Sequence, residues 1–466
     1  MNPYKFCSIL KNASVKKSLT ELHKDFVITP IDKASNNVSI ICKKFYIDTL
    51  KNEVQSSNTF KLCTKMEKSI FKEHKNYYQK LNIKYVEECQ TLPYLYSTSK
   101  MHKVPPKFRF ITCATSTSLE GISKILTVCL KRLLKFAKNR AKYLNAYTSY
   151  NTYFIVDDRH DIINFLTTSN FKRKFGGAKS VRTYDFSNLY TSIPHDKLKA
   201  NIKQFVTEVF DASGKCFINV KNNKAYLSNK VADLSFNAKT LVDAIFYLID
   251  NCFIKFEKQI YRQIVGIPMG TSCAPFLANI FLYVYEKNVV IDLVDKGKID
   301  HASNLANIFR YQDDCIVLND KGLFDTIYHD IYPAELTLLN TNISSRKVTF
   351  LDMAISLYQG KFKHYLYNKR DDFDFSVIMY PYLSGNIPKV PSYGVYLSQL
   401  LRICDICSDY YQFKNEVINL NKKLVNQGFQ LLSLKRKFEL FCKRYIHIWS
   451  KYGIDLFRDD ILNALF

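Results

Sequence analysis

The sequence predicts an α+β fold, and three observations lead to it. Short β-rich runs recur between positions 26 and 366, several of them with alternating polar and apolar residues. Longer stretches carry one apolar face at helical spacing, as in residues 119–142. Beyond about position 396 the pattern is helical to the end. Because 466 residues exceed the usual size of one hydrophobic core, we expect two or three lobes.

The charge of the chain favours a polyanionic partner. Lys and Arg number 67 against 42 acidic residues, a formal net charge of +25 that is spread along the chain. Such an excess is typical of nucleic-acid binding, although a basic protein without that partner is the alternative. The N-terminus has no apolar signal core, and no run reaches about 18 apolar residues. We therefore expect a soluble, intracellular protein that does not enter a membrane.

The thirteen cysteines predict buried thiols in a reducing compartment, because most lie in apolar surroundings and they form no disulfide framework. Cys404 and Cys407 form a Cys-x-x-Cys, yet no second pair lies at zinc-finger spacing. Both share a helical face with Leu400 and Leu401, which favours core thiols over a metal site.

The N-terminal part of the chain predicts strands and helices after a polar, basic lead. The lead is either a short helix or disordered. The expected elements are a β-hairpin of 26–28 with 38–41 around a polar turn at 30–37, and helices over 47–85 and 119–142. In the strand 107–111, Lys107 and Arg109 share one face, where two cations can grip a triphosphate. An exposed edge strand that carries cations is the alternative.

Asp185 stands at the end of a predicted strand, before a polar turn, and Pro194 marks the start of a helix. A carboxylate in that place can bind a divalent cation, with help from free backbone carbonyls. Tyr190 follows five residues later and is expected close to whatever the metal holds. An inserted β-hairpin near 216–229 and a core helix over 241–254 come next.

The run GIPMGTSCAP at 266–275 opens a strongly apolar helix over 276–293. Gly266 and Gly270 permit a ligand to approach the backbone closely, and Thr271 or Ser272 is expected to cap the helix. The run is not a P-loop, because the required Gly-Lys pair is absent.

Asp313 and Asp314 interrupt the hydrophobic run RYQDDCIVL and predict a strand-turn-strand unit with carboxylates at its tip. Such a tip can hold a divalent metal. An Asp-Asp pair is more often a solvated turn, and the chain has three other such pairs, at 157–158, 371–372 and 459–460. Asp185 strengthens the prediction of a metal site at this pair, because it supplies a third carboxylate from another strand.

The remaining chain predicts a second hairpin and a helical end. Residues 345–355 and 361–366 alternate around a turn at 359–360, and a Pro- and Gly-containing connection follows at 373–396. Helices are expected over 396–407, 413–426 and 433–449. These patterns divide the chain into a lead at 1–24, mixed parts at 25–180 and 181–372, and a connector with helices at 373–466.

Taken together, these segments resemble a reverse transcriptase, and most closely the polymerases of Penelope-like retroelements. The motifs that carry the resemblance are KFRFI (107–111), DFSNLYTSIP (185–194), GIPMGTSCAP (266–275), YQDD (311–314), FLDMAI (350–355) and YGVY with SQ (393–399). Each is modest alone, and their joint order makes the match specific. The resemblance implies a right-hand polymerase with β-rich fingers at 25–180, a palm with an antiparallel sheet flanked by helices at 181–372, and a helical thumb within 373–466.

The resemblance also implies a metal site. Asp185, Asp313 and Asp314, with the backbone carbonyl of Phe186, would bind two Mg²⁺ ions, for which Mn²⁺ can substitute. Two such ions lower the pKa of a primer 3′-hydroxyl and stabilise the leaving pyrophosphate. Lys347 is a candidate proton donor to that pyrophosphate.

Nucleotide and primer contacts follow from the same resemblance. Arg109 and Lys107 would hold the triphosphate, and Tyr190 would act as an aromatic gate against the 2′-hydroxyl, which favours deoxynucleotides. The loop from Gly266 to Gly270 would support the nascent base pair. Its Met269, where other reverse transcriptases carry Gln, is shared by Penelope-like enzymes. The primer grip would begin at Phe350, Leu351 and Asp352.

The expected partners are an RNA template, a DNA primer or target DNA, and deoxynucleotides, with the nucleus as the site of action. The sequence does not indicate an oligomeric state. Many Penelope-like proteins carry a C-terminal GIY-YIG nuclease, and this chain ends at Phe466 without that pattern, so either a natural nuclease-free form or a truncated copy is expected. Two alternatives stay open. One is an RNA-dependent RNA polymerase, against which the bulky Tyr190 counts, and the other is a non-enzymatic nucleic-acid-binding protein descended from a polymerase.

Overall fold

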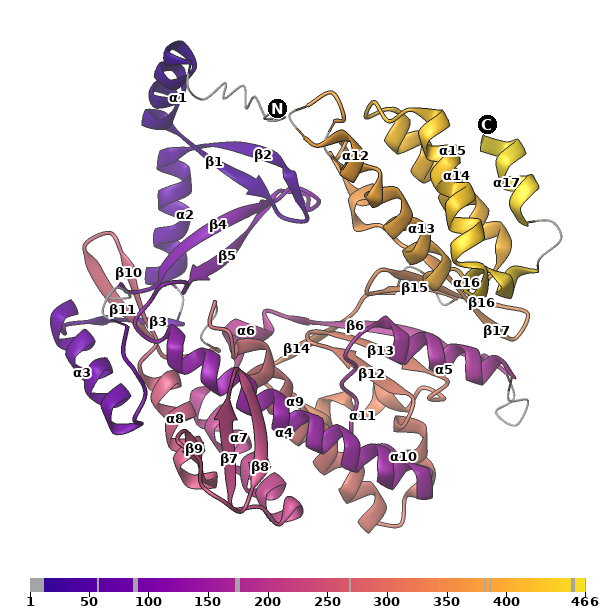
Figure 1. Cartoon of the computed structure of the whole chain (residues 1–466). Helices are drawn as coiled ribbons and strands as arrows, with labels where there is room; N and C mark the ends of the chain where they lie inside the picture. Colours follow the sequence, from indigo (N-terminus) through magenta and orange to yellow (C-terminus); the bar gives the residue numbers. More distant parts are fainter. Residues whose placement is uncertain are drawn as a thin grey trace.

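The computed structural model describes residues 12–465 except 57, 87–90, 172–176, 268–269, 343, 345, 381, 386 and 454–456. Figure 1 shows three parts: N-terminal strands and helices at upper left, C-terminal helices at upper right, and a larger mixed part below. Within the predicted lead, helix α1 (Ala13–Asp25) forms. No helix in the described part of the chain is long and apolar enough to cross a membrane.

A seven-stranded sheet forms the N-terminal part. Its path runs β2-β1-β4-β10-β11-β3, with β5 paired to β4. The strands are β1 (Phe26–Ile31), β2 (Ala34–Cys42), β3 (Phe60–Cys63), β4 (Tyr94–Lys100), β5 (Lys107–Cys113), β10 (Phe253–Phe256) and β11 (Gln259–Gln263). Helix α2 (Lys43–Ser56) covers the sheet, because its side chains at helical spacing, Tyr46, Leu50 and Val54, join a core with strand residues.

Pairing in this sheet confirms one prediction and corrects another. β1 and β2 form the predicted hairpin, but Ile31 lies opposite Ala34, so the turn holds only Asp32 and Lys33. The predicted helix over 47–85 is wrong as a single element. Strand β3 separates α2 from α3 (Glu67–Lys80), because it pairs with β11. Local periodicity carries no signal of a partner strand so far along the chain.

A four-stranded sheet in the order β12-β13-β6-β14 lies in the lower part of Figure 1. Its strands are β6 (Val181–Ser187), β12 (Ile308–Tyr311), β13 (Asp314–Leu318) and β14 (Thr337–Asn340). Its core is shared with helices α4 (Glu120–Tyr147), α7 (His195–Ser213), α8 (Ala238–Asp250) and α9 (Ala274–Asp295). Shorter helices in this part are α5 (Arg159–Phe171), α6 (Leu189–Ser192), α10 (Ile299–Leu305) and α11 (Leu323–Ile331).

Two smaller sheets complete this region. The order β8-β7-β9 contains the predicted insertion hairpin, and the order β15-β16-β17 contains the predicted second one. Their strands are β7 (Phe217–Lys221), β8 (Lys224–Ser228), β9 (Ser235–Phe236), β15 (Lys347–Phe350), β16 (Met353–Tyr358) and β17 (Lys361–Leu366). The expected strand over 345–355 is wrong, because a turn with Leu351 at φ 56° divides it. The expected helix over 241–254 ends at Asp250, since Phe253 and Ile254 belong to β10.

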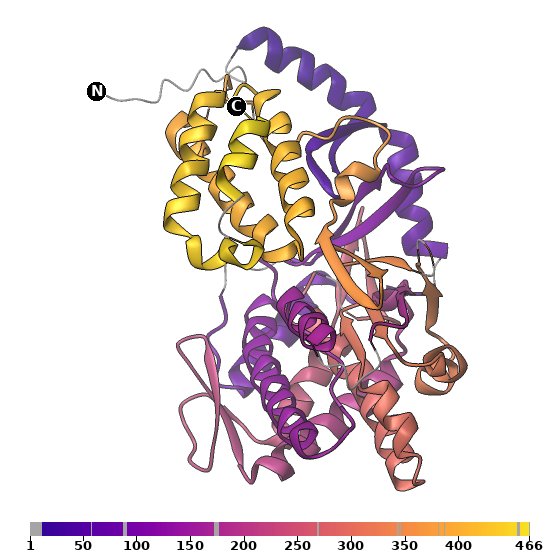
Figure 2. The same cartoon turned by 90° about the vertical axis from the view of Figure 1, so that its right-hand side faces the viewer.

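The C-terminal helices form a bundle with its own core. They are α13 (Gly394–Ile406), α14 (Tyr410–Val425), α15 (Leu431–Arg444), α16 (Ile446–Trp449) and α17 (Phe457–Leu465), preceded by α12 (Lys389–Ser392). The three predicted helices are confirmed, with the last divided at Tyr445. Cys404 and Cys407 are buried, which confirms that they are core thiols. Figure 2 shows the bundle standing above the lower part.

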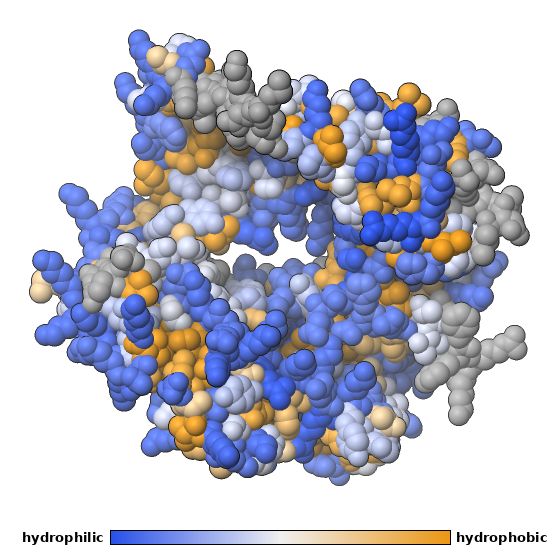
Figure 3. All heavy atoms as spheres, viewed as in Figure 1, coloured by the Kyte–Doolittle hydropathy of each residue, from blue (hydrophilic) through white to orange (hydrophobic). Residues whose placement is uncertain are grey.

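The tip of the β1–β2 hairpin contacts the segment that precedes the bundle. The Asn37 side chain donates to the Ser376 carbonyl (3.3 Å) and accepts from the Ile378 N–H (2.9 Å), while Asn36 donates to the Ile378 carbonyl (3.0 Å). Beside these bonds lies an apolar cluster of Ile31, Ala34 and Phe373. The three parts thus close into a ring, and Figure 3 shows the opening at its centre, bordered mainly by hydrophilic residues.

Candidate active site

The β12–β13 hairpin presents its two aspartates at a two-residue turn. Tyr311 pairs with Asp314, so Gln312 and Asp313 form the turn, and Gln312 adopts φ 57°. Asp314 lies directly opposite Asp185 of β6. The Phe186 N–H donates to the Asp313 carbonyl at 3.0 Å, which ties the turn to β6. The structure therefore brings the three predicted carboxylates together at one end of the sheet.

The carboxylates share one electrostatic environment. Burial raises the pKa of Asp185, and the charge of Asp313 acts in the same direction. Burial raises the pKa of Asp314 to about 6; Asp313 and Asp185 add to the rise, and Lys369 opposes it. The neighbouring negative charges thus resist ionisation of the site, which is the situation that a bound cation relieves.

The site's donors suit Mg²⁺, although they form no ready cage. Among the described residues, no three His, Cys, Asp or Glu side chains converge as a preformed metal cluster. Asp185, Asp313 and Asp314 nevertheless supply only carboxylate oxygens, which are the donors that hard divalent cations prefer. Their mutual repulsion is a second property that fits a cation.

A fully buried ion pair stabilises the β12–β13 turn. Arg310 and Glu286 are both completely buried, and the Arg310 guanidinium bonds both Glu286 carboxylate oxygens, at 2.5 and 3.1 Å. Arg310 also donates to the Asn279 side chain (2.8 Å) and to the Gln312 carbonyl (3.0 Å). Tyr332 donates to Glu286 at 3.0 Å. Because this pair has several hydrogen bonds, it fixes the backbone of the turn without leaving a charge unpaired.

Tyr190 lies beside the β12–β13 turn. It belongs to α6, and its hydroxyl donates to the Gln312 side-chain oxygen at 2.9 Å. Burial raises the pKa of Tyr190 to about 12, and the charge of Asp313 adds to the rise. The phenol is therefore neutral and its proton is engaged with Gln312.

Gly266 and Gly270 allow the backbone to pack closely against α6 and β5, respectively. A Cβ at Gly266 would lie 2.5 Å from the Tyr190 carbonyl, and one at Gly270 would lie 1.8 Å from the Thr112 carbonyl of β5. Both residues have positive φ, 87° and 84°, so glycine meets two requirements at each position. The predicted cap by Thr271 or Ser272 is wrong: Cys273 is the N-cap residue of α9 and makes no side-chain cap bond. Met269 lies outside the described residues.

The predicted triphosphate-binding cations lie on β5. Arg109 is about half exposed and pairs with Asp32 at 3.0 Å, and Lys107 is exposed opposite Lys100. Sequence reasoning missed two lysines. Lys369, in the 3-10 helix η4 (Lys369–Asp372), and Lys33, in the β1–β2 turn, both lower the pKa of Asp185 and of Asp314.

The two missed lysines come from distant parts of the chain that meet at the site. The Arg370 side chain, next to Lys369, donates to the Lys33 carbonyl at 3.4 Å. Burial and the charge of Lys369 lower the pKa of Lys33. Lys33 was recognisable as a turn residue, but the sequence held no signal that Lys369 returns to the same place.

The residues of the predicted primer grip lie around the β15–β16 turn. Phe350 is buried, Leu351 occupies the turn, and Asp352 pairs with Arg402 of α13 (3.0 Å) and Arg159 of α5 (3.3 Å). Asp352 thus joins this turn to the helical bundle.

Lys347, the predicted proton donor, starts β15. Its ammonium lies 5.6 Å from the centre of the Tyr365 ring. The structure thus places Lys347 on the three-stranded sheet β15-β16-β17.

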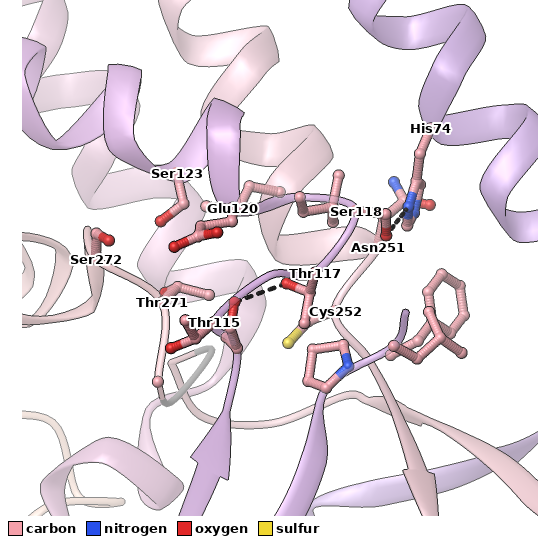
Figure 4. Close-up of a pocket in the computed structure, with 17 residues that line it drawn as sticks. His74, Thr115, Thr117, Ser118, Glu120, Ser123, Asn251, Cys252, Thr271 and Ser272 are labelled. Carbon is pink, nitrogen blue, oxygen red and sulfur yellow. Dashed lines mark hydrogen bonds between the residues drawn. The ribbon is translucent and has the colours of Figure 1, made fainter. Parts of the chain in front are cut away.

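A small cavity of about 70 Å³ lies next to the 266–270 loop, between α3, the start of α4 and Cys252 (Figure 4). Its lining is rich in hydroxyl groups, and the His74 ring nitrogen Nδ1 bonds the Ser118 hydroxyl at 2.8 Å. Burial lowers the pKa of His74 to about 4, so the ring is neutral at pH 7. Gly270 is the one predicted site residue among the described residues that line it.

Comparisons with known proteins show the fold. No protein-family model matches the sequence, and no curated protein matches it significantly. A telomerase from Candida albicans, solved with the TWJ fragment of telomeric RNA, is 10% identical over 97% of this chain and 68% of that chain, with a TM-score of 0.54. Apo telomerase from Candida tropicalis is 12% identical over 96% and 70% of the two chains, with a TM-score of 0.49. The first likeness shows a right-hand polymerase fold, which confirms the predicted fold class.

Proposed function

We propose that this protein is an RNA-directed DNA polymerase of the Penelope-like type, which extends a primer 3′-hydroxyl with deoxynucleotides along an RNA template. The observation that carries the proposal is the meeting of Asp185 and Asp314 as direct partners on β6 and β13, with Asp313 in the adjoining turn. In a right-hand polymerase fold, this is a site for nucleotidyl transfer.

In this function Asp185, Asp313 and Asp314 would hold two Mg²⁺ ions, for which Mn²⁺ can substitute. The ions, when bound, supply charge neutralisation at the attacking and leaving oxygens of an in-line displacement. The protein's own contribution is to fix the carboxylates. The bond from Phe186 to Asp313 and the Arg310 contact with the turn keep them in place without further ordering at the moment of reaction.

The incoming deoxynucleotide meets cations on one side and Tyr190 on the other. Lys33 and Lys369, with Arg109 nearby, carry the positive charge that a triphosphate requires. In this proposal the Tyr190 ring excludes a ribose 2′-hydroxyl and so favours deoxynucleotides; its contact with the turn next to Asp313 supports that role.

The RNA template and DNA primer occupy the opening at the centre of the ring. Its hydrophilic border and the net charge of +25 suit a nucleic-acid duplex. The turn at Leu351 and Asp352, held by Arg159 and Arg402, is the candidate support for the primer end. A template copied in this way in a retroelement would place the protein in the nucleus.

Primer extension tests the proposal. The full chain is given an oligonucleotide primer on an RNA template with Mg²⁺ or Mn²⁺ and either deoxynucleotides or ribonucleotides, beside the double variant Asp313→Ala, Asp314→Ala. We expect DNA synthesis by the wild type, and a loss of at least about a thousandfold in the double variant, as is typical when charge-stabilising groups are removed from an active site.

Three results would contradict the proposal in different ways. Synthesis with ribonucleotides alone would indicate an RNA-dependent RNA polymerase. Binding of RNA without synthesis under either metal would indicate a non-enzymatic nucleic-acid-binding protein. Equal synthesis by the wild type and the double variant would remove these aspartates from the mechanism.

A further inference from the structure

The hydrogen bond between Tyr190 and Gln312 joins two elements that are far apart in sequence. Tyr190 lies on α6, and Gln312 lies in the β12–β13 turn next to Asp313. The phenol oxygen and the Gln312 side-chain oxygen are 2.9 Å apart, and the bond is partly buried. It is a direct side-chain contact between the candidate gate and the turn that carries the carboxylates.

The backbone at each end of this bond is fixed independently of the bond itself. The Gln312 carbonyl accepts from the buried Arg310 at 3.0 Å. The Tyr190 carbonyl accepts from the Ile267 N–H at 2.7 Å, and the absence of a side chain at Gly266 permits this close approach. The two side chains still have rotational freedom of their own. Packing of Tyr190 against the large core limits that rotation in part, and the hydrogen bond to Gln312 restricts it further.

We propose that Gln312 is a positioning residue for sugar selection: it holds the Tyr190 ring in the place where the ring excludes a 2′-hydroxyl. This inference rests on the proposed function. Deoxynucleotides and ribonucleotides differ at this position by one hydroxyl, so an aromatic ring that cannot rotate away rejects the larger sugar. A Tyr190 ring without the hydrogen bond to Gln312 can rotate away and admit the larger sugar. Because the Tyr190 proton is engaged with Gln312, the phenol also has no proton to offer the 2′-hydroxyl.

A purely structural role of Gln312 in the turn predicts a different result. The positive φ of Gln312 and its carbonyl bond to Arg310 belong to the backbone, and a Gln312→Met variant keeps both. Methionine has nearly the same length and, like glutamine, no special tolerance of positive φ, so it removes the acceptor oxygen alone. Gln312→Glu keeps an acceptor in that position.

The test compares kcat/KM for a deoxynucleotide and for the matching ribonucleotide on a primed RNA template. The variants are Gln312→Met, Gln312→Glu, Tyr190→Phe and the double variant Gln312→Met, Tyr190→Phe. The control is Gln55→Met, because Gln55 is likewise hydrogen-bonded to a tyrosine hydroxyl: it donates to that of Tyr261, in the seven-stranded sheet, at 3.1 Å. The ratio of kcat/KM for the two nucleotides does not change when a variant loses activity toward both equally, as expected from the added charge in Gln312→Glu.

We expect the preference for deoxynucleotides to fall about three- to tenfold in Gln312→Met, the range set by one hydrogen bond. In Tyr190→Phe the preference for deoxynucleotides should fall by a similar factor. In the double variant it should fall no further, because all three variants remove the same hydrogen bond. The change should lie in a lower KM for the ribonucleotide. Gln312→Glu should keep most of the preference, and Gln55→Met all of it.

Two outcomes overturn the inference and leave the proposed function standing. One is an unchanged preference for deoxynucleotides in Gln312→Met. The other is a fold-loss of preference in the double variant that equals the product of the fold-losses in the two single variants. A wild type that makes no DNA overturns the proposed function, and the inference with it. Urea unfolding of the same four variants shows whether each is folded. Equal midpoints for Gln312→Met and wild type assign a changed preference to the gate and not to a damaged turn.

Discussion

Two hairpin turns of the same length meet at the candidate site, and they are held in opposite ways. The β12–β13 turn, Gln312 and Asp313, rests on the fully buried pair Arg310 and Glu286. The β1–β2 turn, Asp32 and Lys33, has no such pair beneath it among the described residues. The Asp32 N–H donates to the Ser99 carbonyl at 2.9 Å and the Asp32 carboxylate pairs with the half-exposed Arg109, while Asn36 and Asn37 bond residues 376–378 and Arg370 bonds Lys33 in partly exposed contacts. Buried charge pairs are costly to break and surface hydrogen bonds are not. The turn that carries the carboxylates is therefore the more firmly held of the two, and the turn that brings a cation is the easier to displace.

The largest effect that this comparison predicts is on stability. Arg310→Met leaves Glu286 buried without its charge partner and should lower the free energy of unfolding by about 3 to 5 kcal/mol. Urea denaturation measures it. The double variant Arg310→Met, Glu286→Met is the control: it should regain much of the stability, yet remain impaired in polymerase rate, because the Gln312 carbonyl has still lost its donor. A neutral effect of Arg310→Met would contradict the firmer hold on this turn.

The second effect is a pH dependence at the more firmly held turn. Because burial raises the pKa of Asp314 to about 6, the folded protein binds more protons than the unfolded chain between roughly pH 4 and 6. The stabilisation is present below about pH 4 and is lost as the pH rises through 6. Facing Asp314 are Lys369, Asp313, Asp185 and Lys33.

The variant Asp314→Asn isolates this pH dependence. In EDTA at pH 8 it should be more stable than the wild type by about 2 kcal/mol, and the gap should close near pH 4. Urea denaturation at the two pH values measures the gap. A gap of equal size at both values would mean that Asp314 ionises as freely in the folded protein as in the unfolded chain.

A smaller effect is expected at the more easily displaced turn. Asn37→Ala removes the bonds to Ser376 and Ile378 and should raise KM for deoxynucleotides about three- to tenfold through a displaced Lys33, while the unfolding free energy changes by about 1 kcal/mol. Steady-state primer extension separates KM from kcat. Asn229→Ala is a matched control, because Asn229 accepts from the Cys216 N–H in the insertion hairpin. If kcat falls with KM unchanged, the turn is not a nucleotide contact.

The smallest effect concerns a surface ion pair near the same contact. Lys423 of α14 pairs with Asp371 of η4 at 3.0 Å, and the two side chains are 41% and 61% exposed. Lys423→Ala should change the unfolding free energy by no more than about 0.5 kcal/mol. A larger loss in urea denaturation would mean that the bundle holds η4, and with it Lys369, more firmly than the exposed contacts suggest.

The strands and helices with strong local patterns were predictable. Alternation identified β5, whose two faces differ in burial, and the continuous apolar run 276–293 identified α9, which is buried around most of its circumference. β3 was not predictable, since its four residues are defined by pairing with β11 and not by their own sequence.

The carboxylates of the site were predictable from the sequence, but the charged residues that surround and stabilise them were not predicted. Asp185 and Asp314 stand out as strand-end carboxylates, whereas Lys369 reaches them only through the folding of the chain after β17. Arg310 and Glu286 did leave a signal. Each is a charge inside a run that is otherwise largely apolar, one in a buried strand and one in a buried helix, and opposite charges in such runs are typical of a buried pair.

The contact between the β1–β2 hairpin and residues 376–378 has a topological consequence. A ring admits a linear strand by its end, but it admits a strand without ends only when the ring opens. Circular and linear templates with the same primer site would therefore differ in the rate of loading and agree in the rate of each later addition. Weakening the asparagine bonds would erase that difference, so a polymerase of the proposed kind that threads its template through this ring would respond to the shape of the template apart from its sequence.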